Sequence, residues 1–303
     1  MTTLPLLSEE PINTTPETHD ARLWSVTSII SALAKDALVP WAALRTAEAA
    51  VDDMDVWTSR LEREGRASAI DYLKQARFRG ARGQRSATEL GTAVHRACEY
   101  AALHGHFRPE DTNDPELVPF LRQFRAFLKD FQPRYQCAEV TVYHPTYGYA
   151  GTLDAIIQLG GQSFVLDYKT SREDLDSRGH PKGPYAEVGL QLAAYRYAEM
   201  AAVWRARATE VSRRRYYLLN DTERALAVPV PKVDHGLVVY LTPERYAVHP
   251  IRCDEEIFDA FLAVLDASRF LNDTSKSVVG NALIPPSALR HATDDPFAGL
   301  PTE

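Results

Sequence analysis

Cysteine is scarce in this sequence, and the few cysteines stand far apart. Three occur among 303 residues, at Cys98, Cys137 and Cys253, and no two of them form a C-x-x-C pair. Three unpaired cysteines fit a reducing compartment, where disulfides rarely persist. We therefore expect a cytoplasmic protein.

Long apolar runs are missing as well. No stretch approaches the roughly 20 residues that a membrane-spanning helix needs, and the N-terminus lacks a basic region followed by an apolar core. The sequence therefore predicts no membrane association. Hydrophobic residues make up 45% of the chain and charged residues 25%, which is the composition of an ordinary globular protein. The chain is long enough to bury one substantial core beside a helical accessory lobe.

The sequence also lacks an excess of positive charge. Lys and Arg number 34 against 41 Asp and Glu, which gives a formal net charge of −7. Because duplex-binding proteins usually carry a basic footprint, this total argues mildly against a nucleic-acid partner. The distribution argues the other way, since arginines gather at 77–85 and 213–215. The first group suits either a loop that grips a phosphate backbone or a solvated basic turn, and its candidate substrate-binding residues are Arg79, Arg82 and Arg85.

Two apolar segments joined by a Gly-Gly step form the most informative pattern. Residues 155–159 and 163–168 are rich in Ile, Val, Leu and aromatic side chains, and the two glycines between them predict a β-hairpin with a two-residue turn. In that register the numbers of facing residues sum to 321, so Asp154 faces Asp167. Directly opposed like charges destabilise a sheet, which indicates that a cation lies between them.

Lys169 adds a positive charge to the same surface. It lies two residues beyond Asp167 and therefore points to the same face of the strand. Two carboxylates and an ammonium together suit a divalent-metal site that cleaves phosphodiesters. The alternative is a sheet-edge salt bridge between Asp167 and Lys169, with Asp154 in solvent. Against it, the hairpin carries apolar residues on both faces, which predicts burial on both, and buried charges need partners or a metal.

Two predicted helices carry further polar residues at four-residue spacing, which stacks side chains on one face. The upstream helix, 88–99, aligns Gly91, His95 and Glu99. The downstream helix, predicted over 187–205 from its Ala and Leu content, aligns Gln191 and Tyr195. Each group is weak alone, and a single helix histidine is more often ordinary than a ligand. In chain order, however, the pieces form the set Gly-x-x-x-His-x-x-x-Glu, Gly-x-x-Asp, Asp-x-Lys and Gln-x-x-x-Tyr.

This ordered set resembles the PD-(D/E)XK nuclease superfamily, and within it the RecB-type exonuclease branch. The sequence is similar to the small CRISPR-associated-type exonucleases, including stand-alone versions carried by bacteriophages. The resemblance covers residues 88–251 well and extends more weakly to 25–30 and 38–42. It implies an α/β protein with a restriction-endonuclease-like core, and a metal-dependent DNA exonuclease that acts in the host cytoplasm if a phage encodes it.

The resemblance also implies a set of metal ligands. His95, Asp154 and Asp167 would bind Mg²⁺ or Mn²⁺, with the backbone carbonyl of Tyr168 as a further oxygen ligand. These cations prefer oxygen ligands and keep several waters, so few protein groups suffice. A bound cation would also let the opposed carboxylates stay ionised together.

Further roles follow from the same resemblance. Lys169 would orient the attacking water or stabilise charge on the scissile phosphate. Gln191 and Tyr195 would brace the site and touch the DNA backbone. Glu99, one turn beyond His95, would orient the imidazole ring or hold a metal-bound water.

Two departures from the family pattern stand out. Many RecB-type relatives carry an iron–sulfur cluster, which normally takes four cysteines, whereas this chain has three scattered ones. We therefore expect no iron–sulfur cluster. The second departure is Leu153, which stands where the superfamily name has proline, and this change is common in the branch.

The remaining sequence predicts the organisation of the chain. We expect a disordered leader over 1–20, a helical lobe packed on the core over 21–84, the nuclease core with a C-terminal helix over 85–271, and a mostly disordered tail over 272–303. The order of helices and strands predicts a mixed β-sheet flanked by helices. Residues 171–185 form a charged loop directly after Lys169, which suits a lid or a substrate-contact loop. The other predicted helices are 120–131 and 254–270, and the predicted strands are 137–143, 149–159, 163–170, 214–219, 237–241 and 245–251.

Taken together, the sequence predicts a Mg²⁺- or Mn²⁺-dependent deoxyribonuclease that hydrolyses phosphodiester bonds in DNA, at ends or in single strands, through metal-activated water. DNA recombination, repair or phage DNA processing would be its setting, with a helicase or a recombination protein as a possible partner. One alternative is a DNA-end-binding or assembly subunit without hydrolytic activity. Another is an endonuclease built on the same core.

Overall fold

A mixed β-sheet forms the centre of the computed structural model, which describes residues 21–33, 38–79, 84–176, 178–202, 207–211, 214–219 and 221–282. Within those residues the sheet has ten strands, and seven run in the order β10-β9-β4-β3-β1-β7-β6. On the side of β3, β2 pairs with β3 and β5, and β5 pairs with β8. The strands are β1 (Ala21–Ser25), β2 (Arg134–His144), β3 (Tyr149–Leu159), β4 (Gln162–Thr170), β5 (Met200–Ala201), β6 (Arg207–Val211), β7 (Arg214–Leu219), β8 (Val228–Pro229), β9 (His235–Leu241) and β10 (Tyr246–Ile251).

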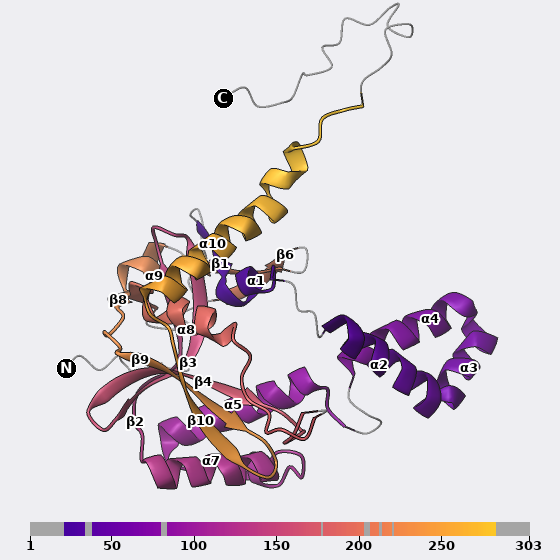
Figure 1. Ribbon diagram of the computed structural model, residues 1–303, viewed down its shortest axis with the longest axis horizontal. Helices are drawn as coiled ribbons and strands as arrows, with labels where there is room; N and C mark the ends of the chain where they lie inside the picture. The colour runs from indigo at the N-terminus through magenta and orange to yellow at the C-terminus, as the bar shows by residue number, and fades with distance from the viewer. Residues whose placement is uncertain are drawn as a thin grey trace, which may run out of the picture.

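Helices cover both faces of this sheet. One face packs against α5 and α7 and the other against α1, α8 and α10, which Figure 1 shows as layers below and above the strands. The prediction of an α/β protein with a mixed sheet flanked by helices is confirmed. The helices of the two layers are α1 (Val26–Ile30), α5 (Ala87–His104), α7 (Val118–Phe131), α8 (Val188–Arg196) and α10 (Glu255–Asn272), and the short α6 (Pro109–Thr112) and α9 (Asp221–Ala225) lie in connections.

The predicted hairpin is strands β3 and β4, in the predicted register. Ile156 pairs with Val165 and Gln158 with Ser163. The turn glycines at 160 and 161 have φ angles of +56° and +87°, the positive values that a tight two-residue hairpin turn requires. Both faces are buried as expected, because Ile156 and Val165 lie in the cluster with α8, whereas the neighbouring side chains contact α5 and α7.

The predicted helix over 187–205 is wrong in its second half. Helix α8 ends at Arg196, and Met200–Ala201 form a short strand between β2 and β8. The Ala-rich composition favours a helix locally, but Ala201 is fully buried and its backbone pairs with Val142. Sheet pairing therefore overrides local helix propensity. Residues 203–206 lie outside the described part of the chain.

The predicted N-terminal lobe begins too early, because Ala21–Ser25 form a strand of the central sheet. This strand, β1, pairs with β3 and β7, and helix α1 follows it directly into the core. The short stretch carries Leu23, Trp24, Val26 and Ile29, all at most 9% exposed. Their burial assigns this segment to the core rather than to a separate lobe.

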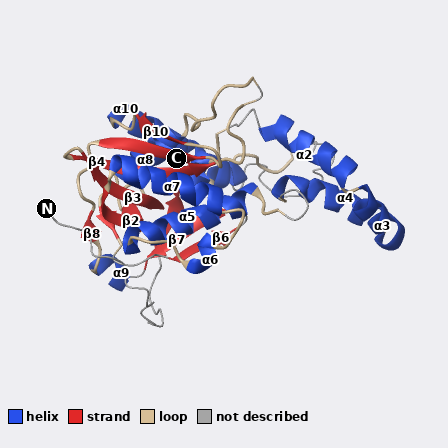
Figure 2. Ribbon diagram, turned by 90° about the horizontal axis from the view of Figure 1, so that it is seen from below, coloured by secondary structure: helices blue, strands red, loops and turns tan. Residues whose placement is uncertain are grey.

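The remainder of the predicted lobe is helical but does not pack on the sheet. Helices α2, α3 and α4 form an arm with the 3-10 turn Gln75–Phe78, and both views show the arm standing away from the strands (Figures 1 and 2). Pro40 lies in the first turn of α2, where its missing N–H breaks no helical hydrogen bond. The three helices are α2 (Leu38–Asp52), α3 (Met54–Glu64) and α4 (Arg66–Lys74).

The chain ends were predicted as disordered. The 1–20 leader and residues 283–303 of the tail lie outside the described residues. Residues 272–282 are described, and they complete α10 and form the 3-10 turn Thr274–Ser277, so the predicted tail begins too early. Among the described helices, none combines the length and apolar character needed to cross a membrane.

The start of α5 is fixed by a capping box. Ser86 Oγ accepts from the Glu89 N–H at 3.2 Å, and the Glu89 carboxylate accepts from the Ser86 N–H at 2.7 Å. Ser86→Ala is therefore expected to lower the free energy of unfolding by about 1 kcal/mol. Urea denaturation followed by circular dichroism measures this, with the exposed first-turn change Thr88→Ala as the matched control. Equal midpoints for the two variants would contradict the role of the cap.

Candidate functional site

The candidate site lies on one edge of β3, at the point where this strand changes partner. On that edge β3 pairs with β1 through Tyr149 and Ala150, and with β4 from Ala155 onward. Residues 151–154 therefore lie between two partner strands that diverge from β3. This gap in the ladder gives side chains from both helical layers access to the same point of the sheet.

Asp154 lies at the end of this gap. Its Oδ2 accepts from the backbone N–H of Tyr168 at 2.7 Å and lies 3.4 Å from Nδ1 of His95. His95 reaches it from α5, on the helical layer that contains α5 and α7. The ladder of β3 and β4 pairs ends one step before Asp154 and Asp167, so the two carboxylates are not joined as a hydrogen-bonded pair of strand residues.

Asp167 and Lys169 lie together, as their alternation along β4 predicted. Lys169 Nζ lies 2.7 Å from Asp167 Oδ2 and donates to Gln191 Oε1 at 3.2 Å. Gln191 Nε2 in turn donates to Asp167 Oδ1 at 3.0 Å and lies 3.3 Å from the Tyr195 hydroxyl. Helix α8 therefore braces β4 through Gln191. Six side chains of the motif set each contact another member of the set: His95, Asp154, Asp167, Lys169, Gln191 and Tyr195.

Burial and opposing charges set the protonation of the two carboxyl groups. Burial raises the pKa of Asp167 to about 6, with Asp154 adding to the rise and Lys169 opposing it. Burial acts in the same direction on Asp154, but the neighbouring His95 and the Tyr168 N–H outweigh it and lower its pKa. Burial opposes the charged form of His95, yet the Asp154 carboxylate raises the pKa of this imidazole to about 8.

The donor set suits a hard divalent cation in its chemistry. Asp167 Oδ2 is buried and accepts no hydrogen bond of good geometry from any described residue, so its one close partner is the Lys169 ammonium. Two carboxylates beside a backbone carbonyl are ligands that Mg²⁺ and Mn²⁺ favour. In the arrangement observed, no three His, Cys, Asp or Glu side chains of the described residues gather closely enough to hold a metal ion. The carboxylates are instead turned toward Lys169, His95 and the Tyr168 amide.

Two contributors to the site, Gly151 and Tyr135, were missed or undervalued by sequence reasoning, and a further residue, Glu139, lies level with Asp154 on the neighbouring strand β2. A Cβ on Gly151 would lie 2.6 Å from Cε1 of Tyr195, so only glycine leaves room for that ring. The Tyr135 hydroxyl lies 2.6 Å from the Tyr168 hydroxyl and holds that side chain behind His95. Glu139, opposite Asp154 in the β2–β3 register, has a φ of +52°, which is rare for a residue with a side chain. Of these residues, only Gly151 was marked in the sequence, as the glycine of the Gly-x-x-Asp motif.

Two of the three candidate substrate-binding arginines, Arg79 and Arg85, are described, and both lie apart from this centre. Arg79 belongs to the arm, where its guanidinium stacks 3.7 Å from the centre of the Tyr72 ring. Arg85 precedes α5 by two residues and lies ten residues before His95, about 15 Å along a helix axis. Arg82 lies outside the described residues.

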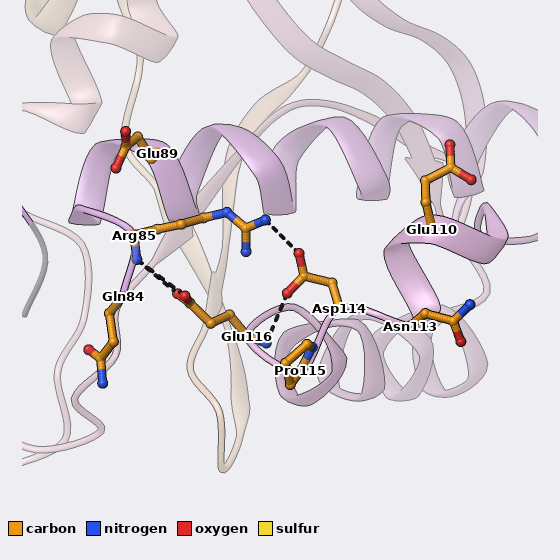
Figure 3. A pocket seen from close by; sticks show the side chains of 8 residues that line it. All are labelled: Gln84, Arg85, Glu89, Glu110, Asn113, Asp114, Pro115 and Glu116. Carbon is orange, nitrogen blue, oxygen red and sulfur yellow. Dashed lines mark hydrogen bonds and ion pairs between the residues drawn. The ribbon is translucent and has the colours of Figure 1, made fainter. Parts of the chain in front are cut away.

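An open pocket of about 780 Å³ surrounds Arg85 (Figure 3). Arg85 Nη2 lies 2.6 Å from Asp114 Oδ2, and its backbone N–H donates to Glu116, so its charge is already matched. The rest of the lining is mainly acidic, with Glu89 and Glu110 among it. Such a pocket repels phosphate, and we therefore locate the candidate site at the β3 gap.

The three cysteines lie in different parts of the buried core. Cys98 is on α5, Cys137 is on β2, and Cys253 lies between β10 and α10. Burial raises the pKa of each thiol. None of the three takes part in the contacts of the candidate site described above.

Comparison with known proteins adds little to this geometry. No family model and no curated protein matches the sequence. A solved structure of a protein named SSO0001 is 19% identical, and the match covers 60% of this chain and 75% of that one with a TM-score of 0.29. A TM-score this low supports no conclusion about fold or function.

Proposed function

We propose that this chain is a metal-dependent DNA exonuclease of the PD-(D/E)XK superfamily, with a restriction-endonuclease-like core. One observation carries the proposal: the buried Asp167, the largely buried Asp154, a lysine and a histidine meet at the gap of β3, and Gln191 from α8 contacts both Asp167 and the lysine. A fold stabilised by packing alone does not need this set, because burying charged groups is costly unless they are fully paired. A site that binds a cation and a phosphate explains why the chain keeps these charged groups despite the free-energy cost of burying them.

The residues divide into metal-binding and positioning groups under this proposal. Asp154, Asp167, the Tyr168 carbonyl and His95 would hold Mg²⁺ or Mn²⁺. The bound ion would neutralise charge on the phosphate and lower the pKa of an attacking water. Lys169, whose Nζ lies 2.7 Å from Asp167 Oδ2, would face the scissile phosphate or the attacking water.

Gln191 and Tyr195 serve as positioning residues in this scheme. Gln191 contacts both the carboxylate of Asp167 and the ammonium of Lys169, so it fixes the two groups relative to each other. Tyr195 is 2% exposed and its hydroxyl lies 3.3 Å from the Gln191 amide, which limits the amide's rotation. Preorganisation of this kind places reacting groups without further ordering at the moment of reaction.

Metal dependence is the direct test of the proposal. Linear single-stranded DNA labelled at one end is expected to shorten with Mn²⁺ or Mg²⁺ and to remain intact with EDTA, since the proposed hydrolysis uses a metal-activated water. Gel electrophoresis of the products measures this, and the label position reports polarity. Degradation at an equal rate in EDTA would refute the proposed metal chemistry.

Circular single-stranded DNA separates an exonuclease from an endonuclease, because an end-dependent enzyme leaves the circle intact.

An assembly subunit without hydrolytic activity is the second candidate function. The arm of α2–α4 favours it, because several large apolar side chains there are exposed, and such surfaces often mark protein contacts. Their exposed fractions are 42% for Trp41, 56% for Leu44, 72% for Val51 and 55% for Met54. Binding of DNA ends by the wild-type chain without cleavage under either metal would favour this function over the nuclease.

A further inference from the structure

The charged loop between Lys169 and α8 is fastened to the body of the protein at several points. Arg245 Nε donates to Asp174 Oδ1 at 2.5 Å, and the same oxygen accepts from the Thr242 hydroxyl at 2.9 Å. Arg172 Nη2 donates to Glu116 Oε2 at 2.6 Å. Within the loop, Leu175 and Pro181 form an isolated bridge. These contacts fix the described residues of the loop, which begins directly after β4, and this favours substrate contact over the lid predicted as its other role.

A tyrosine on β9 is the neighbour of the candidate catalytic lysine in the sheet. Tyr240 pairs with Lys169 across the neighbouring strands β4 and β9, so their backbones lie about 4.8 Å apart. Burial raises the pKa of the Tyr240 phenol; Lys182 and Arg245 oppose the rise and the Tyr185 phenol adds to it. Of these groups, Lys182 and Tyr185 belong to the charged loop, and the Lys182 carbonyl accepts from Arg245 Nη2 at 3.2 Å, which holds this part of the loop beside the end of β9.

Tyr185 lies at the end of the charged loop, and 75% of it is exposed. Its backbone carbonyl accepts from the N–H of Val188, the first residue of α8, so its position is tied to the helix that braces the site. Gly183 and Pro184 precede it, and the exposed Arg178 belongs to the same loop. An exposed ring on a fixed loop loses little conformational freedom when a flat partner stacks on it.

We propose that Tyr185 is a stacking platform for one nucleobase of a single DNA strand whose neighbouring phosphate lies at Lys169. The inference rests on the proposed function and specifies its substrate as a single-stranded end. Stacking on an aromatic side chain needs a base with a free face, which a paired base inside a duplex does not offer. The acidic total charge of the chain gives base stacking added weight, because phosphate contacts alone are weakened by a net charge of −7.

Binding measured without cleavage tests this inference. A fluorescein-labelled oligothymidine and the same strand with abasic residues are titrated in EDTA, and anisotropy gives the dissociation constants. Tyr185→Ala is expected to weaken binding of the normal strand about tenfold, since stacking contributes roughly 1–3 kcal/mol per base, and to leave the abasic strand unaffected. Tyr185→Trp keeps a flat ring and is expected to bind as wild type does. Phe270→Ala, an exposed aromatic on α10, is the matched control.

The outcomes separate this inference from the proposed function. An equal loss on normal and abasic strands, or no loss at all, would overturn the role of Tyr185 even if the wild type cleaves DNA. A ring-dependent preference for the normal strand without cleavage in Mg²⁺ or Mn²⁺ would support Tyr185 and refute the nuclease. If the wild type binds neither strand in EDTA, the stacking role of Tyr185 falls, and cleavage with Mn²⁺ or Mg²⁺ still decides the nuclease. A protein ligand for Tyr185 would leave DNA binding unchanged in Tyr185→Ala and would likewise overturn the inference.

Discussion

Asp167→Asn is expected to abolish DNA cleavage, with a loss of at least about a thousandfold in rate, equivalent to roughly 4 kcal/mol of transition-state stabilisation. The change removes a carboxylate ligand from the proposed metal site while it keeps the size of the side chain. End-labelled single-stranded DNA with Mn²⁺ measures the rate. The fold is expected to remain, because asparagine still offers an oxygen to the Gln191 amide, which lies 3.0 Å from Asp167 Oδ1.

Stability gives this variant a second, independent readout. The raised pKa of Asp167, about 6, means that its ionised form is disfavoured by burial and by Asp154 in the folded chain. This penalty is present above the folded pKa and disappears as the pH falls below the unfolded value, so Asp167 lowers stability as the pH rises between them. Asparagine removes the penalty but also the ion pair with Lys169, and we expect a net change within about 1 kcal/mol at pH 7.

A matched control separates lost chemistry from a damaged fold. Asp266→Asn makes the same change on the surface of α10, where the side chain is 77% exposed, and is expected to retain the wild-type rate and melting temperature. Wild-type cleavage by Asp167→Asn would remove Asp167 from the site. An unfolded variant would be recognised by its circular dichroism, and Lys169→Met, which keeps the apolar stem of a half-exposed side chain, would then carry the test.

The sequence was sufficient for the centre of the fold because the local signals there agree with the tertiary structure. The Gly-Gly turn and the apolar runs fixed the hairpin register, and strands 149–159 and 214–219 were predicted with the bounds observed. The four-residue spacing of His95 on α5, and of Gln191 and Tyr195 on α8, placed each side chain toward the sheet. The order of the motifs indicated the contacts of His95 with Asp154 and of Gln191 with Asp167.

The errors arose where a segment depends on partners distant in the sequence. Strand β1 is five residues long and takes its pairing from β3 and β7, more than a hundred residues away, so local reasoning assigned it to a helix. The end of α8 is set by the pairing of Ala201 with β2, against the local propensity. The position of the α2–α4 arm away from the sheet depends on which surfaces pack together, and the composition of the segment does not specify this. The close approach of Tyr195 to Gly151 likewise arises only when a strand and a distant helix are packed together.

Gly151→Ala is expected to show the second large effect, because this close approach leaves no space for a methyl group. A Cβ at residue 151 would lie 2.6 Å from Tyr195 Cε1, 3.1 Å from its hydroxyl and 3.2 Å from Val26 Cγ2. Tyr195 is 2% exposed and has little room to retreat, so the variant must shift this ring and the Gln191 amide beside it. We expect a loss of about 1–3 kcal/mol in the free energy of unfolding and a loss of about a hundredfold in cleavage rate.

A double-mutant cycle on stability identifies the cause of that loss. Tyr195→Leu removes the ring edge that the new methyl group meets, so Gly151→Ala is expected to cost little stability in its presence, and urea denaturation of the four proteins gives the coupling free energy. Gly183→Ala is the control, since a Cβ there meets nothing closer than 3.6 Å. Additive effects at 151 and 195 would contradict the steric argument. Cleavage should stay low in the double variant, because restoring space for the methyl group does not restore the hydroxyl that holds Gln191 between Asp167 and Lys169.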